Sequence, residues 1–420
     1  MSAFDRTTQD QIAQGQPAWR AEQMSNAYAA FEAQVLPSGA EETWRYVDLG
    51  FDLDGLVPAT DPGEAIAPGP FLTTAGGESS GRITILDGAV VEVTVTDENV
   101  SVRRLGELDS LAPAAAVDRD KFAAAHVAFA RDGVRVESAR RSVVDRPLVI
   151  DIQATIPGTV SFPHVEIVAG AESELPVVLV YRSPDGIENV AVPGITLEAG
   201  DGGRLRFLSV QGWGDATVGI THQRLRLGRD ATGRLGEVGL GGRLARLDLE
   251  VELEGVGSST EVVGLYFGER EQTLDYRMVI NHIGRNTSSD VFLKGAVEDD
   301  AQSIFTGLLR IEKDAIRSSA FETNRNLVLS ENAKAHSVPN LEILCNDVVC
   351  GHGSSVGPLE EEHLYYLQSR GISRTRAERM LVRGFFTEVI DRLPVDVVAE
   401  PLQQAVFRRF VEAQEEGRIT

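Results

Sequence analysis

The stretch LDLEVELEGVGSS, residues 247–259, decides the fold of this chain. Leucine and valine at its odd-numbered positions from 247 to 253 alternate with aspartate and glutamate. This period of two is typical of a strand that buries one face. The glycines and serines that follow are typical of a turn. We therefore predict a half-buried strand that ends in a turn near residue 255.

Similar turn signals recur through the middle of the chain, with strand-forming sequence between them and almost no helical period. Their spacing is near 30 residues at first and near 15 later. This interval favours the stacked coils of a parallel β-helix, in which each coil buries its inward face on its neighbours. A β-sandwich is the alternative, but its strands usually turn every 8 to 12 residues or so. The turn clusters lie at 199–203, 228–233, 254–259, 284–289, 298–302, 312–315 and 330–334.

Helical sequence flanks this β-rich core. Residues 8–35 are rich in alanine, glutamine and glutamate and predict a small helical cap at the N-terminus. From Glu360 to Glu416 the helical period returns, with Gly371 suited to a helix end and Ser373 to the next helix start. We expect three domains, which are an N-terminal helical and mixed cap (1–140), a parallel β-helix core (141–358) and a C-terminal helical domain (359–420).

Composition excludes several classes of partner. The 420 residues contain 63 acidic and 40 basic side chains, which gives a net charge of −23 and makes nucleic acid and anionic membranes poor partners. No apolar window is long enough to span a bilayer, and the first twenty residues lack the pattern of a secretion signal, so we expect a cytoplasmic protein. Cys345 and Cys350 are the only cysteines and do not form a CxxC pair.

The segment NDVVCGHGSSVG, residues 346–357, contains the most reactive pair of side chains. In an extended strand Cys350 and His352 project to the same side, and Cys345 is predicted to face the other way unless a bulge intervenes. Thiolate and imidazole are ligands suited to iron or zinc, but two ligands do not complete a site. The alternative interpretation is a small buried cysteine beside a hydrogen-bonded histidine.

Other familiar site patterns are missing from the sequence. There is no Walker A motif, no strand-linked GxGxxG and no HxH or HExxH pair. The remaining histidines are therefore not expected to complete a metal site. They are His126, His164, His222, His282, His336 and His363.

Residues 322–393 resemble the C-terminal signature of the SufB/SufD family of iron–sulfur cluster assembly proteins. The elements TNRNLVLS, PNLEI, CGHG, LYYLQSRGIS and ERMLVRGFF occur in the family's order. ETWRYVDL (42–49) and DKFAAAHVAFARDGV (120–134) are similar to its N-terminal elements. The resemblance implies a right-handed parallel β-helix flanked by helical segments.

The resemblance also implies partners and a site. A SufD-like chain is expected to pair with a SufB-like paralogue through the β-helix and to bind a SufC-like ABC-type ATPase through its C-terminal helices. A transient iron–sulfur cluster near the SufB contact would be bound in part by His352, with Cys350 as a weaker candidate. The isolated chain is not expected to bind a cluster stably, and it could form a homodimer.

Two local features favour SufD over SufB. A SufB-like chain is expected to have a glutamate-bearing segment in place of CGHGSS and a cysteine on the strand that here reads TNRNLVL. Asn324, Arg325 and Asn326 supply no thiolate, so we expect a non-catalytic subunit rather than the main cluster scaffold. Two alternatives remain, which are a carbohydrate-active β-helix enzyme and a homomeric Suf-type scaffold.

Overall fold

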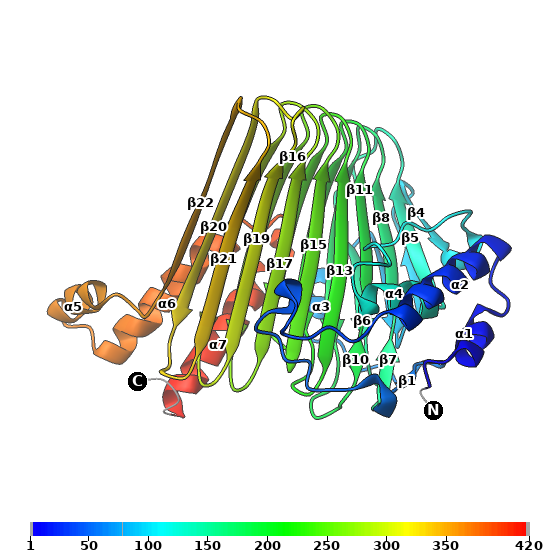
Figure 1. Ribbon diagram of the computed structural model, residues 1–420. Helices are drawn as coiled ribbons and strands as arrows, with labels where there is room; N and C mark the ends of the chain where they lie inside the picture. Colours follow the sequence, from blue (N-terminus) through cyan, green and yellow to red (C-terminus); the bar gives the residue numbers. More distant parts are fainter. Residues whose placement is uncertain (1–2, 78, 417–420) are drawn as a thin grey trace.

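The computed structural model describes residues 3–77 and 79–416 and is mainly β (Figure 1). Two long sheets, one of 12 strands and one of 10, face each other across a common interior. From residue 194 onward, successive strands alternate between the two sheets, and a strand pairs in parallel with the one two positions further along the chain. This connectivity is that of a parallel β-solenoid and excludes the sandwich alternative, as the sequence predicted.

The regular elements have the following bounds. The strands are β1 Val57–Pro58, β2 Gly81–Leu86, β3 Ala89–Val95, β4 Val100–Arg104, β5 Gly133–Ser138, β6 Leu148–Gln153, β7 Thr159–Ser161, β8 His164–Ala169, β9 Glu174–Arg182, β10 Val190–Ala191, β11 Gly194–Ala199, β12 Arg204–Gly212, β13 Val218–Leu227, β14 Thr232–Gly239, β15 Leu244–Leu253, β16 Ser259–Gly268, β17 Thr273–His282, β18 Ser288–Val297, β19 Gln302–Ile311, β20 Ser318–Val328, β21 Lys334–Ile343 and β22 Val348–Gly357. The α-helices are α1 Arg6–Ala13, α2 Ala18–Ala33, α3 Pro70–Gly76, α4 Lys121–Phe129, α5 Glu361–Ser369, α6 Arg374–Ile390 and α7 Ala399–Glu415. Short 3₁₀ helices lie at Glu42–Trp44, Leu53–Gly55, Leu105–Glu107 and Asp396–Val398.

One coil of the solenoid consists of two strands and two turns. Leu244 pairs with Thr273 of the next coil, and Thr273 with Gln302, so a coil takes 273 − 244 = 29 residues. The turn interval near 30 therefore measures a whole coil, whereas the interval near 15 measures one strand with its turn. The early turn clusters mark only every second turn, because the intervening turns are less obvious in sequence.

The interior contains the apolar residues that alternate along each strand. Leu249, Val251 and Leu253 are fully buried between the sheets, whereas Glu250 and Glu252 remain partly exposed on the outer face of β15. The strand predicted from residue 247 is thus confirmed with the expected face inward. Burying a side chain of this size contributes about 1.5–3 kcal/mol.

The N-terminal helices cover the outer face of the 12-stranded sheet. Phe4, Tyr28, Phe31, Phe129 and Phe162 form an aromatic cluster there, with ring centroids 5.4–6.5 Å apart. The helical segment predicted over 8–35 is confirmed, and it consists of two helices, α1 and α2, with a break between them. The break contains a glycine with φ of 87° and a proline that directly precedes α2, and both disfavour a continuous helix.

The C-terminal helices α6 and α7 cover the outer face of the 10-stranded sheet together with α3 (Figure 1). Phe386 and Phe410 are 2% and 1% exposed and pack among the outward apolar residues of that sheet. The predicted helix boundaries are confirmed, because Gly371 adopts φ of 82° just after α5 and Ser373 is the N-cap of α6. Within the described residues, no helix is long and apolar enough to cross a membrane.

Strands β2 to β5 are continuous with the two sheets. β2 pairs in parallel with β6, and β5 pairs in parallel with β8. Part of the segment 1–140 therefore contributes strands to the solenoid's first coils. The three-domain division of the chain at residues 140 and 358 stays a prediction.

Candidate functional site at the open end of the solenoid

The last coil, β21 and β22, leaves the solenoid open. Each strand is the terminal one of its sheet, and each pairs on one side only, with β19 and β20 respectively. Both strands are ten residues long, and no further strand among the described residues covers their outer edges. We call β21, β22 and the turn at 344–347 the open end. In Figure 1 it lies at the side opposite the N-terminal helices.

Apolar side chains are exposed around the open end. Val349 of β22 is 62% exposed, a large fraction for a valine in a regular strand. Unpaired edges and exposed apolar residues together are typical of a surface that pairs with another chain. The exposed large apolar residues of this region are Phe321, Val338, Leu341, Leu344, Val349 and Val356.

Cys350, His352 and Ser354 lie on the face of β22 that continues the interior column of β20. Register pairs them with Ala320, Glu322 and Asn324, all of which are buried. The Ser354 hydroxyl donates a hydrogen bond of 2.8 Å to the Ser337 hydroxyl of β21, across the gap between the sheets. The structure therefore places the cysteine and the histidine on one face, as a period of two predicts.

The two candidate metal ligands, Cys350 and His352, differ in solvent exposure. Cys350 is partly buried and packs against the interior core, whereas His352 is exposed. Cys345 is 8% exposed and packs against the same core from the turn at 344–347. The prediction that it faces away from Cys350 is therefore wrong. The reason is that a turn separates the two cysteines, so strand alternation does not relate them.

Glu322, one strand below His352, was missed by the sequence reasoning. It is 2% exposed, and neither of its carboxyl oxygens has a hydrogen-bond partner among the described residues. Burial raises the pKa of Glu322 to about 8. Strand alternation could have identified it, because Glu322 lies two residues from both Ala320 and Asn324 and therefore points into the interior with them.

The TNRN motif forms a polar network beneath the open end. The Asn326 side-chain NH₂ donates to the Asn324 side-chain oxygen at 2.6 Å, and the Asn324 NH₂ donates to the Tyr266 hydroxyl at 3.1 Å. The Tyr266 hydroxyl in turn donates to the Asn326 side-chain oxygen. Arg325 points to the outer face and is exposed. The two asparagines are thus interior residues whose hydrogen-bonding groups satisfy one another.

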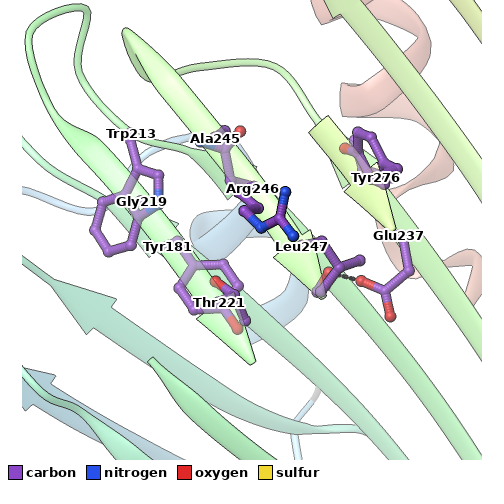
Figure 2. Close-up of a pocket in the computed structure, with 12 residues that line it drawn as sticks. Tyr181, Trp213, Gly219, Thr221, Glu237, Ala245, Arg246, Leu247 and Tyr276 are labelled. Atoms are coloured by element: carbon purple, nitrogen blue, oxygen red, sulfur yellow. Dashed lines mark hydrogen bonds between the residues drawn. The ribbon is translucent and has the colours of Figure 1, made fainter. Parts of the chain in front are cut away.

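A second buried polar group lies deeper in the solenoid. Figure 2 shows Glu237 beside a cavity that is also lined by Tyr181, Thr221 and Tyr276. The cavity volume of about 20 Å³ accommodates about one water molecule. Burial raises the pKa of Glu237 to about 7, while hydrogen bonds donated by Ser209 and Gln223 oppose that rise. Unlike that of Glu322, this carboxyl group accepts hydrogen bonds from side chains of the same protein.

The other histidines do not share the inward face of β22 with Cys350 and His352. His126, His164 and His222 are buried between α4 and the sheet, where burial lowers the pKa of the first two. His336 stacks on Tyr46 at 4.1 Å, on the outer face of β21. Over residues 3–77 and 79–416, no three histidine, cysteine or acidic side chains are grouped as a metal site.

A second exposed apolar surface lies on the C-terminal helices. Tyr365 and Tyr366 of α5 are 75% and 57% exposed. Met380 of α6 and Phe407 of α7 are also exposed, although both helices bury their opposite faces on the 10-stranded sheet. Figure 1 shows α5 projecting beyond the sheets on the side of the open end.

Comparison with known proteins is consistent with this architecture. Residues 152–385 match the family model described as SUF system FeS cluster assembly, SufBD core domain. An iron–sulfur cluster assembly SufBD family protein of Mycobacterium tuberculosis is 32% identical over 90% of this chain and 91% of its own length. SufD of Bacillus subtilis is 30% identical over 70% of this chain and 68% of its own length. SufD of Escherichia coli is 27% identical over 59% and 57%. The chain therefore belongs to the SufB/SufD family of SUF-system iron–sulfur cluster assembly proteins, and within that family it is SufD-like.

Proposed function

We propose that this chain is the non-catalytic, SufD-like subunit of a cytoplasmic SufBCD-type complex that assembles iron–sulfur clusters. It pairs with a SufB-like paralogue through the open end and docks a SufC-like ABC-type ATPase through its C-terminal helices. ATP hydrolysis belongs to that ATPase. The observation that carries this proposal is the open end, with two ten-residue strand edges beside exposed apolar side chains. Membership of the SufB/SufD family favours this role over a carbohydrate-active enzyme.

The edge strands support pairing with a homologous β-helix. Their unpaired backbone groups can form hydrogen bonds with the strands of another chain, and Val349 and its apolar neighbours would become buried at the same contact. A SufB-like paralogue would present a comparable open coil. When this chain is alone, the same edges could join two copies, so a homodimer or a homomeric scaffold is the second outcome to test.

The cluster is the cargo of the complex, and this chain would supply only some of its ligands. His352 offers an exposed imidazole, and Cys350 a thiol on the same face of the same strand. Imidazole and thiolate are both suitable iron ligands. Because these two groups do not complete a coordination shell, the other ligands would come from the partner across the interface. The cluster would therefore be transient on this chain.

A pull-down from cells that co-express the SufB-like partner tests the pairing. Val349→Asp places a charge on the open end and should reduce co-purification of the partner, because a charge buried at an apolar contact is unfavourable. Val91→Asp is the matched control, since Val91 is 46% exposed on β3 at the other end of the same sheet. Full co-purification with Val349→Asp would overturn the proposed interface.

The ATPase contact is tested on α5. Deleting residues 360–420 should abolish ATPase binding, but it would also uncover the apolar face of the 10-stranded sheet beneath α6 and α7. Tyr365→Asp avoids this problem, because Tyr365 is exposed and its loss leaves the sheet covered. Val35→Asp, at another highly exposed apolar position, is the control. Unchanged ATPase affinity in Tyr365→Asp would contradict docking through this helix.

The role of His352 is tested by comparing stability with cluster assembly. His352→Ala should leave the melting temperature and the partner contacts nearly unchanged, because the side chain is exposed. It should reduce the iron content of the reconstituted complex, and Cys350→Ser should have a smaller effect. Val91→Ala is the control, since Val91 is exposed on β3 and lies outside both proposed contact surfaces. A lowered melting temperature with normal iron loading would mean that His352 is structural.

A further inference from the structure

Glu322 is an unusual residue for the interior of a β-solenoid. Its side chain is 2% exposed, and no described residue forms a hydrogen bond with either carboxyl oxygen. Burying a polar group without a partner costs about 1–3 kcal/mol by mutational measures. Glu237, the other glutamate at an interior position of the same sheet, accepts hydrogen bonds from Ser209 and Gln223. Glu322 therefore lacks the hydrogen bonds by which the fold satisfies a comparable group.

Space is kept open for the Glu322 carboxyl group on the opposite sheet. Gly307 of β19 faces it, and a Cβ atom at that position would overlap both carboxyl oxygens. The side chain thus crosses the interior and ends against the one residue type that leaves room for it. Any larger residue at position 307 would displace the carboxyl group, so the two residues form one structural unit.

Register places this carboxyl group directly below the open end. Glu322 pairs with His352, and Ala320 pairs with Cys350, on adjacent parallel strands. Such strands lie about 4.8 Å apart, so in-register side chains on the same face are immediate neighbours. The three side chains Glu322, Cys350 and His352 therefore share one interior face, and β22, which carries two of them, is the last strand of its sheet.

We propose that Glu322 is the interior ligand of a ferrous-iron site at the open end, where its carboxylate binds the ion together with His352 and Cys350. The inference rests on the proposed function, because it assigns a further donor to the same site. Carboxylate, imidazole and thiolate together form a donor set that binds divalent iron, and the anionic carboxylate offsets the charge of the ion. In the present conformation these three side chains are not grouped as a metal site and His352 is exposed, so binding requires its imidazole to turn inward over Glu322.

The test measures metal binding by the full-length chain without partners. Cobalt(II) replaces iron as a stable probe, and its visible absorption reports the ligand set while titration gives the dissociation constant. Glu322→Gln should weaken binding at least about tenfold, the scale on which even outer partners of metal ligands act. His352→Ala should weaken it similarly. Glu237→Gln is the matched control and should leave both the dissociation constant and the spectrum unchanged.

Melting temperatures distinguish a variant that has lost a metal ligand from a variant that has lost its fold. Glu322→Gln replaces a buried carboxyl group by an amide of the same shape, so its melting temperature should not fall. Glu322→Asp is the second variant, since it keeps the charge but shortens the reach by one methylene, and it should weaken cobalt binding as well. Both variants should still co-purify with the SufB-like partner, which distinguishes this inference from the proposed function.

Three outcomes would overturn the inference. Unchanged cobalt binding in Glu322→Gln would show that the carboxyl group is not a ligand, even if His352→Ala lost affinity and the proposed role of His352 remained. Equal weakening in Glu237→Gln would show that buried glutamates act only through the fold. A wild-type chain that binds no cobalt would show that Glu322, His352 and Cys350 do not form an ion site.

Discussion

The stability of the solenoid should depend on the protonation of His282 at the end of β17. This residue is fully buried, its Nδ1 pairs with the Thr287 hydroxyl at 2.8 Å and its Nε2 with the Ser289 hydroxyl at 2.8 Å. Burial lowers the pKa of His282 from 6.5 to about 4. The folded chain therefore holds a neutral imidazole at a pH where the unfolded chain binds a proton.

The direction of the effect follows from linkage. The stabilisation from neutral His282 is fully present above pH 6.5 and is lost as the pH falls from 6.5 to about 4. The difference between these two pKa values corresponds to about 3.4 kcal/mol, of which about 2 kcal/mol is lost by pH 5. Acidification to pH 5 should therefore favour the unfolded chain by this amount through His282 alone.

Urea unfolding at pH 8 and at pH 5 measures this effect. The wild-type free energy of unfolding should fall by about 2 kcal/mol more than that of His282→Gln, which has no titrating ring. The buried residues His126 and His164 titrate in both proteins, so their contributions cancel in the comparison. An equal fall in the two proteins would refute the reasoning, because it would mean that His282 binds its proton equally well in the folded state.

Three further substitutions test packing by thermal melting. Arg246→Met should lower stability by about 3–5 kcal/mol, because Asp275 would be left buried without its cationic partner, and an unchanged melting temperature would show that this pair is dispensable. Gly295→Ala should destabilise by about 1–3 kcal/mol, since its Cβ would overlap the Tyr266 ring, unless that ring can move at no cost. Phe386→Ala should cost about 3–5 kcal/mol by emptying the contact between α6 and the sheet, whereas a small loss would indicate that the helix is loosely docked.

Local alternation in the sequence was sufficient to predict the fold class. The strand near residue 250 has its apolar side chains inward and its acidic ones outward, as the period of two required. The break between α1 and α2 was not predicted, because alanine and glutamine on both sides of Gly15 and Pro17 continue the composition of a helix across the break. Composition averages over a window, whereas a single glycine and proline decide the backbone path locally.

The candidate site was predictable only in part. A spacing of two placed Cys350 and His352 on one face, and that geometry needs no knowledge of other strands. Glu322 could not be recognised in the same way, because its importance depends on Gly307 in another sheet and on register with β22. The side to which Cys345 points was predicted wrongly for a related reason. It lies in a turn, and the alternation of side chains along a strand does not continue through a turn.

The path of the C-terminal helices has a consequence for how the molecule comes apart. In a simple solenoid each coil contacts only its neighbours, so the stack can unravel one coil at a time from either end. Here α6 contacts β16 and β18, while α7 packs on α6 and on α3, which itself contacts β6 and β9. The helices therefore act as a brace that ties the first coils to the later ones, and those coils should unfold together as one cooperative unit.

The final coil lies outside this brace. Among the described residues, the contacts of α6 with β16 and β18 have no counterpart of similar extent at β21 or β22. Local opening has a lower free energy where few buried contacts hold a segment. Amide hydrogens of β22 should therefore exchange with solvent faster than those of β16, and the gap between the two rates should close when a second β-helix covers the open end.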